Sequence, residues 1–577
     1  MAEEPTRVPD IPEASDVVDA EGGPQVSPRR SLSGATAIMA SGTLVSRLLG
    51  FVRTALLSWA ILAIGFSADA FDVANRIPNA LYAVLAAGVF NSVLVPQIVK
   101  AFRRKDGKRT VDRIVTLGLV FSLAISVIFT IAAPFMVRLY SSADWSDDQR
   151  DLATAFAVLV IPQLFFYAAY TILGEILNAR EQFGPYMWAP ALNNVIGIAG
   201  LLVYLGIYGA WTKGADNAAG WTPDRIAWLA IPATIAMAAQ AGILIWPLLR
   251  GGYRPKFVWR GPKGELGTVK VIVAWALAAV IVEQIGLAFA VKVATSANPS
   301  GADLTIAGPA AYFYALLIYL LPHSLVTVSL LTALNTSMAK KYSGGDIEGV
   351  RTDVAKGLRI TATFTSFATV ALIVLAPWLV RLVLPKVPLD QVNSVAPVLV
   401  ALALGMVPLG AMVLVKRTYF VLEDARGIFF IHIPMTIAWI VVAYAGKALF
   451  DAKWWTVGVA LGLSVSNVVG LTLRAGGLRK RLGGLGGRDV TRVHLISALA
   501  AIVAGLVGFA LRIWVLPPPV DGTSGNIVST YLLGGFVCAV TGIAMAIVYV
   551  LILKSTGVSD VNTMIARVTG RLRRNVR

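Results

Sequence analysis

Residues 529–553 read STYLLGGFVCAVTGIAMAIVYVLIL. A helix rises about 1.5 Å per residue, so an uncharged run of this length crosses the roughly 30 Å hydrocarbon core of a bilayer. Similar apolar runs recur along the whole chain of 577 residues, of which 57% are hydrophobic and only 14% charged. Soluble domains carry about 25% charged residues. The sequence therefore predicts an all-α polytopic membrane protein and excludes a soluble enzyme.

Fourteen such runs occur, and we predict fourteen transmembrane helices. They cover residues 37–62, 72–99, 114–139, 152–177, 188–209, 226–249, 268–293, 306–337, 357–384, 393–421, 428–449, 455–477, 494–516 and 529–554. Lys and Arg gather in the loops after even-numbered spans, at 100–113, 250–263, 340–351 and 479–488. Basic loops stay in the cytoplasm. The even loops and both termini are therefore expected to be cytoplasmic.

Cysteines, histidines and nucleotide motifs narrow the chemistry further. The single Cys538 allows no intrachain disulfide and no thiolate metal site, and the three histidines are scattered. No GxxxxGK[ST] motif occurs. We therefore expect no cofactor and no metal, with a coupling ion or the membrane potential as the energy source. The net charge is +18, and the basic residues lie in short loops between spans. This placement favours anionic lipids over nucleic acid as partners.

Two pairs of prolines indicate an internal repeat. Pro162 in span 4 and Pro408 in span 10 are 246 positions apart, and each stands eighteen residues before an Ala-Arg pair. Pro78 and Pro322 are 244 positions apart. Two pairs at nearly one offset suggest that spans 1–6 and 7–12 are duplicates, the alternative being chance. Six is an even number, so we expect two six-helix lobes related by a pseudo-two-fold axis along the membrane normal.

The repeat and the tails divide the chain into five parts. Residues 1–34 are polar and rich in proline, which predicts a disordered cytoplasmic tail. Residues 35–265 form the N-lobe and residues 266–490 the C-lobe, and residues 491–556 add two helices outside the repeat. Residues 557–577 separate apolar from basic side chains around a helix, which indicates a basic amphipathic tail on the inner leaflet. A frayed basic tail is the alternative.

Ionisable side chains within spans are costly and usually face a cavity. Arg47 and Arg53 stand six residues apart in span 1. Six residues turn a helix by about 600°, which is about 120° short of two full turns, so both can border one wide cavity. The other candidate substrate-binding residues are Asp69, Arg76, Asn79, Lys416 and Arg417, with Glu283 and Lys292 as possible C-lobe contributors. Cations outnumber anions in this set, which favours a substrate with concentrated negative charge, such as a pyrophosphate.

Several polar residues within the spans also have a purely structural interpretation. Asp69 and Asp72 are close enough to a span end to lie among outer headgroups. Arg76 is four residues from Asp72 and can pair with it along the helix. Lys292 is near an outer end and can extend to the interface. His323 fits a buried, hydrogen-bonded side chain better than a proton relay.

Four prolines are the candidate hinges. Pro78, Pro162, Pro322 and Pro408 interrupt backbone hydrogen bonds within spans or near their entry. Bent helices allow two lobes to move against each other. Static kinks are the alternative.

Several short motifs then suggest a family. Residues 41–53 read SGTLVSRLLGFVR, residues 68–71 ADAF and residues 77–79 IPN. Residues 174–180 read GEILNAR, and residues 415–420 read VKRTYF. These motifs resemble the MurJ (MviN) lipid II flippase family of the multidrug/oligosaccharidyl-lipid/polysaccharide exporter superfamily. The resemblance extends from the first predicted span to the last.

The resemblance implies a function that the residues alone do not give. It implies a flippase that moves lipid II, the undecaprenyl-pyrophosphate-linked peptidoglycan precursor, from the inner to the outer leaflet of the bacterial cytoplasmic membrane. Alternating access would carry the cargo, and no bond would be broken. The implied partners are lipid II, anionic membrane lipids and cell-wall synthesis proteins.

The resemblance also assigns roles to residues. The cavity arginines of the family fall on Arg47 and Arg53, and its acidic residue before the Ala-Phe pair falls on Asp69. Its Pro-Asn pair falls on Pro78 and Asn79, and its span 10 lysine falls near Lys416. The last two helices, here within residues 494–554, are thought in the family to hold the lipid tail.

The chain departs from the family pattern at several charged positions. Tyr82 and Ala83 stand where the family often has two arginines, and Ala87 stands where it has an acid. The stretch 315–320 lacks the arginine and glutamate that precede Leu-Pro in span 8. Glu283, Lys292 and Arg417 are the candidate replacements, and a divergent paralogue is the alternative.

Three other functions stay open on the sequence. The same scaffold suits an exporter of another polyprenyl-linked glycan or a cation-coupled drug antiporter. A drug antiporter for cations would show a net acidic cavity. A non-transporting scaffold for cell-wall enzymes would act through its basic tails and not through Arg47 and Arg53.

Overall fold

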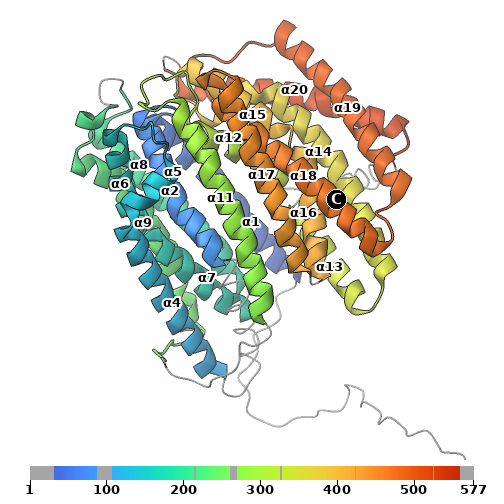
Figure 1. Cartoon of the computed structure of the whole chain (residues 1–577). Helices are drawn as coiled ribbons and strands as arrows, with labels where there is room; N and C mark the ends of the chain where they lie inside the picture. The colour runs from blue at the N-terminus through green and yellow to red at the C-terminus, as the bar shows by residue number, and fades with distance from the viewer. Residues whose placement is uncertain are drawn as a thin grey trace, which may run out of the picture.

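The computed structural model describes residues 32–86, 107–180, 182–212, 216–259, 269–324, 328–422, 424–523 and 526–558. Within these ranges every regular element is a helix, and the helices run side by side through one bundle (Figure 1). The prediction of an all-α membrane fold is confirmed. Residues 1–31 and 559–577 lie outside the described residues, so the predictions for the two tails stay predictions there. The predicted tail boundary at residue 34 falls inside α1, which begins at Leu32.

The first six predicted spans correspond to helices α1 to α10, here called the N-lobe. The bounds are α1 Leu32–Ile61, α2 Phe66–Leu85, α4 Gly107–Ile131, α5 Ala133–Tyr140, α6 Asp147–Val160, α7 Gln163–Ala179, α8 Phe183–Tyr208, α9 Pro223–Gly242 and α10 Ile245–Arg250. A short 3-10 turn, Ala218–Gly220, precedes α9.

The next six predicted spans correspond to α11 to α18, here called the C-lobe, and α19 and α20 follow. The bounds are α11 Val269–Ala297, α12 Pro309–Pro322, α13 Val328–Ser343, α14 Ile347–Val383, α15 Leu389–Ala403, α16 Met406–Val421, α17 Ala425–Leu449, α18 Trp455–Leu482, α19 Gly487–Trp514 and α20 Ile527–Ser555. The blue-to-green first half and the yellow-to-red second half occupy opposite sides of the bundle (Figure 1).

The same helix pairings occur in both lobes. In the N-lobe, α1 packs on α8, α8 on α9, α2 on α6 and α7 on α9. In the C-lobe, α11 packs on α17, α17 on α18, α12 on α15 and α16 on α18. Each C-lobe pair is the N-lobe pair moved by six predicted spans. The duplication inferred from the proline offsets therefore also appears in the packing.

Two of the candidate hinge prolines stand at breaks between helices. Pro162 separates α6 from α7, and α15 meets α16 at an angle of 46° just before Pro408. Pro78 lies inside α2, and Pro322 is the last residue of α12. At the α15–α16 bend, the Ser464 hydroxyl donates to the carbonyl of Ala401 at 2.7 Å. A carbonyl released by the bend is thus satisfied by a neighbouring side chain, as a membrane interior requires.

Eleven helices among the described residues, or up to twelve when the bent α15–α16 pair counts as one span, are long and apolar enough to cross a membrane. The two other predicted spans, 72–99 and 306–337, run into residues outside the described ranges. In addition, α2 includes Asp69, Asp72 and Arg76, and α12 has only 14 residues. Each of the fourteen predicted spans nevertheless coincides with at least one helix.

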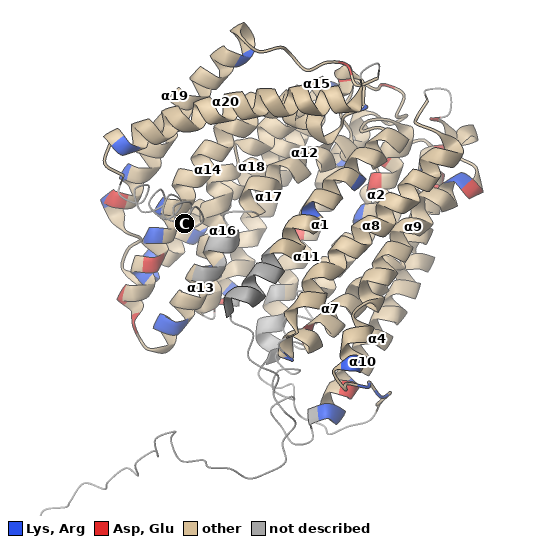
Figure 2. Ribbon diagram, turned by 180° about the vertical axis from the view of Figure 1, so that it is seen from behind, with Lys and Arg blue, Asp and Glu red and all other residues tan. Residues whose placement is uncertain are grey.

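Charged residues lie mainly near the two ends of the helices, whereas the middle of the bundle is mostly uncharged (Figure 2). An exception on α1 is visible at mid-height in the same view. We call the end of the bundle with the α1–α2 connection the odd-loop end, and the opposite end the even-loop end.

Helices α19 and α20 pack against α14 at one edge of the bundle (Figure 1). The Tyr549 hydroxyl donates to the carbonyl of Thr363 at 2.6 Å, and Arg512 donates to the carbonyl of Val374 at 3.0 Å. Their other faces expose large apolar side chains, including Leu506 and Leu532. This arrangement suits contact with lipid, and the lipid-tail groove assigned to these helices stays a prediction.

Candidate functional site

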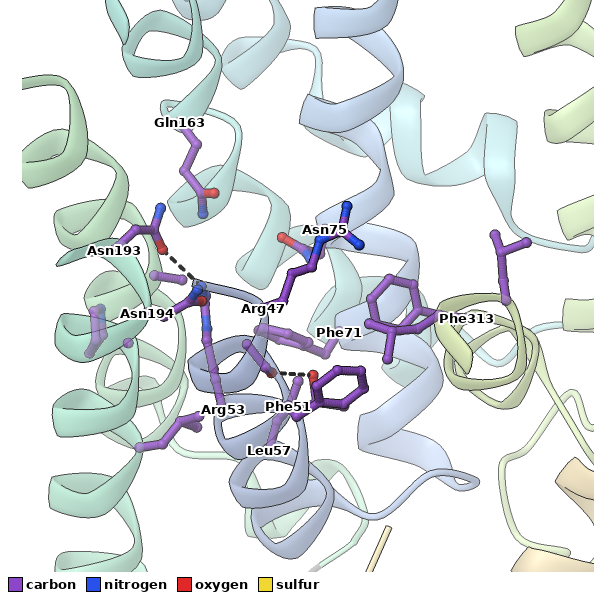
Figure 3. Close-up of a pocket in the computed structure, with 18 of the residues that line it drawn as sticks. Arg47, Phe51, Arg53, Leu57, Phe71, Asn75, Gln163, Asn193, Asn194 and Phe313 are labelled. Atoms are coloured by element: carbon purple, nitrogen blue, oxygen red, sulfur yellow. Dashed lines mark hydrogen bonds between the residues drawn. The ribbon is translucent and has the colours of Figure 1, made fainter. Parts of the chain in front are cut away.

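A cavity of about 560 Å³ lies between the two lobes. Helices α1, α2, α7, α8 and α9 line it from the N-lobe, and α12 lines it from the C-lobe. Figure 3 shows that Arg47 and Arg53 both enter it from α1. The two side chains lie in one cavity, as the 120° offset between their positions predicts.

Arg53 points toward α8 (Figure 3). Its guanidinium donates to Oδ1 of Asn193 at 3.0 Å. The amide of Asn193 in turn donates to Oε1 of Gln240 on α9 at 2.7 Å, which fixes the orientation of the Asn193 side chain. A Cβ at Gly197 would stand only 2.8 Å from Nε of Arg53, so the guanidinium fits because position 197 has no side chain.

Arg47 connects the two lobes across the cavity. Its guanidinium donates to the Ser324 hydroxyl of the C-lobe at 2.6 Å. The Ser324 hydroxyl donates to the carbonyl of Leu321 at 3.0 Å and so keeps its lone pairs for the arginine. Both arginines therefore hydrogen-bond to neutral groups, and neither makes an ion pair with a described residue.

The lining of the interlobe cavity is basic. Arg47 and Arg53 are its only ionisable residues apart from Tyr167 among the described residues, and no carboxylate lines it. Its other polar lining residues are neutral: Thr54, Asn75, Gln163, Asn193, Asn194 and Ser324. Two positive charges in a cavity with mostly apolar walls attract an anion far more strongly than the same charges in water. Arginine forks also match phosphate oxygens in geometry.

Asp69 and Arg76 lie at the interface between α2 and α12 and line neither this cavity nor a second, C-lobe cavity described below. Oδ1 of Asp69 accepts a hydrogen bond from the backbone N–H of Ala310 at 3.1 Å, in the first turn of α12. Arg76 pairs with Asp72 at 2.5 Å and donates to the carbonyl of Pro309 at 2.9 Å. These residues therefore fasten the first half of α2 to the start of α12.

Further contacts between the lobes gather at the same odd-loop end. The Gln391 side chain accepts from the N–H of Ala63 at 3.2 Å and donates to the carbonyl of Ile64 at 3.1 Å. The Trp145 indole donates to the carbonyl of Thr295 at 3.0 Å. Lys447 stands 4.0 Å from Asp144. Among the described residues, polar contacts between the lobes thus close the odd-loop end, and Arg47 with Ser324 is the contact inside the cavity.

The remaining candidate residues are distributed over the bundle. Glu283 and Lys416 line the second cavity, within the C-lobe. Asn79 is exposed and donates to the carbonyl of Asn75 one turn earlier at 2.7 Å. Lys292 and Arg417 line neither cavity. The structure thus brings Arg47 and Arg53 together but separates them from the other candidates.

Sequence reasoning missed several polar residues of the interlobe cavity. Asn75, Gln163, Asn194 and Tyr167 line it, and none was predicted to do so. A neutral polar residue in an apolar span carries little signal, because single hydroxyl and amide groups are common in membrane helices. No cluster of three or more His, Cys, Asp or Glu side chains suited to a metal occurs within the described residues.

Comparisons with known proteins identify the family and support the fold. The family model "Lipid II flippase MurJ" matches residues 59–517. A probable lipid II flippase MurJ of Rhizobium meliloti (strain 1021) is 28% identical over 534 residues, which cover 89% of this chain and 92% of the relative. A solved structure of lipid II flippase MurJ in an inward closed conformation superposes with a TM-score of 0.62 at 18% identity, over 88% of this chain and 98% of that one. An inward-facing multidrug resistance transporter of the MATE family shares the fold more distantly, with a TM-score of 0.57 at 16% identity over 79% of this chain and 99% of that one.

Proposed function

Because the chain belongs to the lipid II flippase MurJ family, we propose that it moves lipid II from the inner to the outer leaflet of the bacterial cytoplasmic membrane. One observation carries the assignment of the site. Arg47 and Arg53 enter a single cavity between the lobes, and no carboxylate lines that cavity within the described residues. Such a cavity suits a diphosphate headgroup and disfavours an organic cation.

The contacts between the lobes support a direction of access. The odd-loop end is closed by the contacts of Asp69, Arg76 and Gln391 with the opposite lobe. Basic residues of the even loops support a cytoplasmic even-loop end. In this conformation the cargo would therefore enter from the cytoplasmic leaflet, and opening of the odd-loop end would release it outside.

We infer the energy source from the charges of the two cavity arginines. The diphosphate would neutralise Arg47 and Arg53 on the way out, whereas the empty carrier returns with both charges exposed to the cavity. Moving one charge across 100 mV changes the free energy by about 2.3 kcal/mol. An inside-negative potential would therefore help to return the empty carrier, and no cofactor is needed. The cargo keeps all its bonds.

Complementation tests the proposal. A bacterium depleted of its own flippase receives the wild-type gene, Arg47→Ala or Arg53→Ala, and outer-leaflet lipid II is measured by surface labelling. We expect the wild type to restore the labelled pool and each variant to lose most of it, at equal amounts of protein in the membrane. Arg138→Ala is the matched control, because Arg138 is exposed and lines neither cavity.

Two outcomes would contradict the proposal. The wild type failing to raise outer-leaflet lipid II would remove the function. Full activity of both arginine variants would separate the function from this cavity and would favour a scaffold role.

A further inference from the structure

A second cavity, of about 170 Å³, lies inside the C-lobe. Helices α11, α12, α16, α17 and α18 line it. Leu316 and Leu320 of α12 line both this cavity and the interlobe cavity, so the two spaces adjoin across one helix. The volume accommodates a group the size of a carboxylate or a phosphate.

Arg474 of α18 is fully buried against this cavity. Its Nη2 lies 3.4 Å from Nε2 of His432, while Nδ1 of His432 lies 2.9 Å from the carbonyl of Ile428. The Nδ1–H of His432 therefore donates to that carbonyl, and Nε2 accepts from Arg474. Nε and Nη1 of Arg474 have no hydrogen-bond partner among the described residues. A buried guanidinium with two unused donors is costly unless acceptors occupy them, and an anion supplies both the acceptors and the opposite charge.

The charges around the cavity leave one positive charge uncompensated. Arg474 and Lys416 contribute two positive charges, and His432 is neutral in the tautomer above. Glu283 is the one carboxylate among the described residues that line the cavity. Glu283 makes no ion pair within 4 Å with Arg474 or Lys416 among the described ion pairs of the chain. The site therefore has a net positive charge and unused donors.

A second fully buried arginine among the described residues of the C-lobe, Arg381, has different surroundings. Arg381 lines neither cavity, and its Nη1 donates to the carbonyl of Val387 at 2.6 Å and contacts two further carbonyls. Backbone oxygens thus surround Nη1 of Arg381, whereas its Nε and Nη2, like two nitrogens of Arg474, have no hydrogen-bond partner among the described residues. The cavity and the nearby cation, and not the unused donors alone, therefore set Arg474 apart. Arg474 faces a cavity and a second cation instead.

We propose that the C-lobe cavity is a second anion site, in which Arg474 and Lys416 bind an oxyanion of the carboxylate or phosphate class. A planar arginine fork favours paired oxygens over a spherical halide. The oxyanion comes either from the cargo, through the shared wall of Leu316 and Leu320, or from solution. The binding site itself does not depend on the proposed flippase function, whereas the cargo source does.

Thermal unfolding of the purified full-length protein tests the site, with inorganic phosphate as the probe and chloride at equal ionic strength as the reference. A ligand that binds only the folded state raises the melting temperature in a saturable way. We expect phosphate to do so in the wild type and chloride not to. Arg474→Gln should weaken the apparent affinity for phosphate by about tenfold or more, because it removes a charge-assisted fork.

Two further variants distinguish a loss of phosphate binding from a folding defect. Glu283→Gln removes the competing carboxylate and should strengthen phosphate binding, a direction that damage to the fold does not produce. Arg381→Gln is the matched control, because it removes an equally buried arginine away from the cavity. It should lower the starting melting temperature yet keep the phosphate response. No saturable shift, an equal shift with chloride, or a full shift in Arg474→Gln would each overturn the proposal.

Addition of lipid II to the same measurement separates the two sources of the oxyanion. If the cargo supplies it, saturating lipid II abolishes the phosphate response. If it comes from solution, the phosphate response persists with lipid II bound. Either result supports the site, and failure of lipid II to bind would count against the proposed flippase function and not against the anion site.

Discussion

At the scale of single residues, the position of Arg53 depends on the absence of a side chain opposite it. The nearest part of α8 is Gly197, where a Cβ would stand 2.8 Å from Nε and 3.0 Å from Cζ of Arg53. The end of an arginine is flexible, so a methyl group at position 197 would move the guanidinium without unfolding the helix. Alanine also has a higher helix propensity than glycine.

We therefore expect Gly197→Ala to reduce lipid II transport by about tenfold while the protein stays folded, because hydrogen bonds to charged groups contribute about 1.5–3 kcal/mol. Transport in proteoliposomes and the melting temperature are the measurements. Gly206→Ala, on the same helix with nothing within 4 Å of its added Cβ, should transport normally. Equal rates in both variants would mean that the position of Arg53 does not limit transport.

Sequence reasoning found the two cavity arginines but missed Arg474. Arg47 and Arg53 stand deep inside a predicted span, where a charge demands an explanation. Arg474 stands three residues before the predicted end of span 12 at residue 477, and a long side chain there can be expected to reach the interface. In the structure α18 continues to Leu482, and the guanidinium is fully buried. The burial of a charge near a span end depends on neighbouring helices and is not visible in the sequence.

At the scale of elements, Asp69 of the N-lobe binds the first turn of α12 in the C-lobe. It accepts from the N–H of Ala310 in the first turn of α12, where unpaired N–H groups and the helix dipole favour a negative charge. Gly308 leaves the space for this carboxylate, since a Cβ there would collide with it. From the sequence, Asp69 is expected to bind substrate or to lie among outer headgroups. Its contact with Ala310, 241 positions away in the chain, leaves no local pattern from which it could be predicted.

We expect Asp69→Ala to weaken closure of the odd-loop end. The measurement is labelling of Thr54→Cys, a cavity position, by a membrane-impermeant thiol reagent added on the odd-loop side, with Cys538→Ser as background. Labelling should be slow in the parent and several-fold faster with Asp69→Ala, because helix-terminus charges contribute about 0.3–2 kcal/mol. Asp303→Ala is the control, since Asp303 accepts from Thr305 within its own loop. Unchanged labelling would show that other contacts suffice to hold this end closed.

At the scale of the whole molecule, the sequence predicted the fold well because the bilayer restricts the possible structures. Backbone groups in a membrane must be satisfied internally, so apolar runs of span length become helices. The proline offsets indicated the duplication, and the shared helix pairings agree with it. The family inferred from motifs at 41–53, 68–71, 77–79, 174–180 and 415–420 is confirmed by the family model, which matches residues 59–517. Breaks such as the one between α6 and α7 were harder to place, since proline alone does not tell a kink from a helix end.

The contacts at the odd-loop end predict that the lobes must separate there in each transport cycle. Lys447 of the C-lobe stands 4.0 Å from Asp144 of the N-lobe, and its Nζ donates to the Ser296 hydroxyl of its own lobe at 2.8 Å. Lys447 therefore takes part in one contact between the lobes and in one contact within the C-lobe. Cysteine pairs at these positions, in the Cys538→Ser background, can be joined by a short reducible cross-linker.

Cross-linking Asp144→Cys to Lys447→Cys should abolish lipid II transport, because rocking of two lobes requires the odd-loop end to open. A reductant should restore it. The pair Ser296→Cys and Lys447→Cys is the matched control, because it uses the same lysine position and the same linker inside one lobe. Its transport should persist after cross-linking. Full transport by the cross-linked interlobe pair would contradict alternating access and would require a path for the cargo that leaves the odd-loop contacts intact.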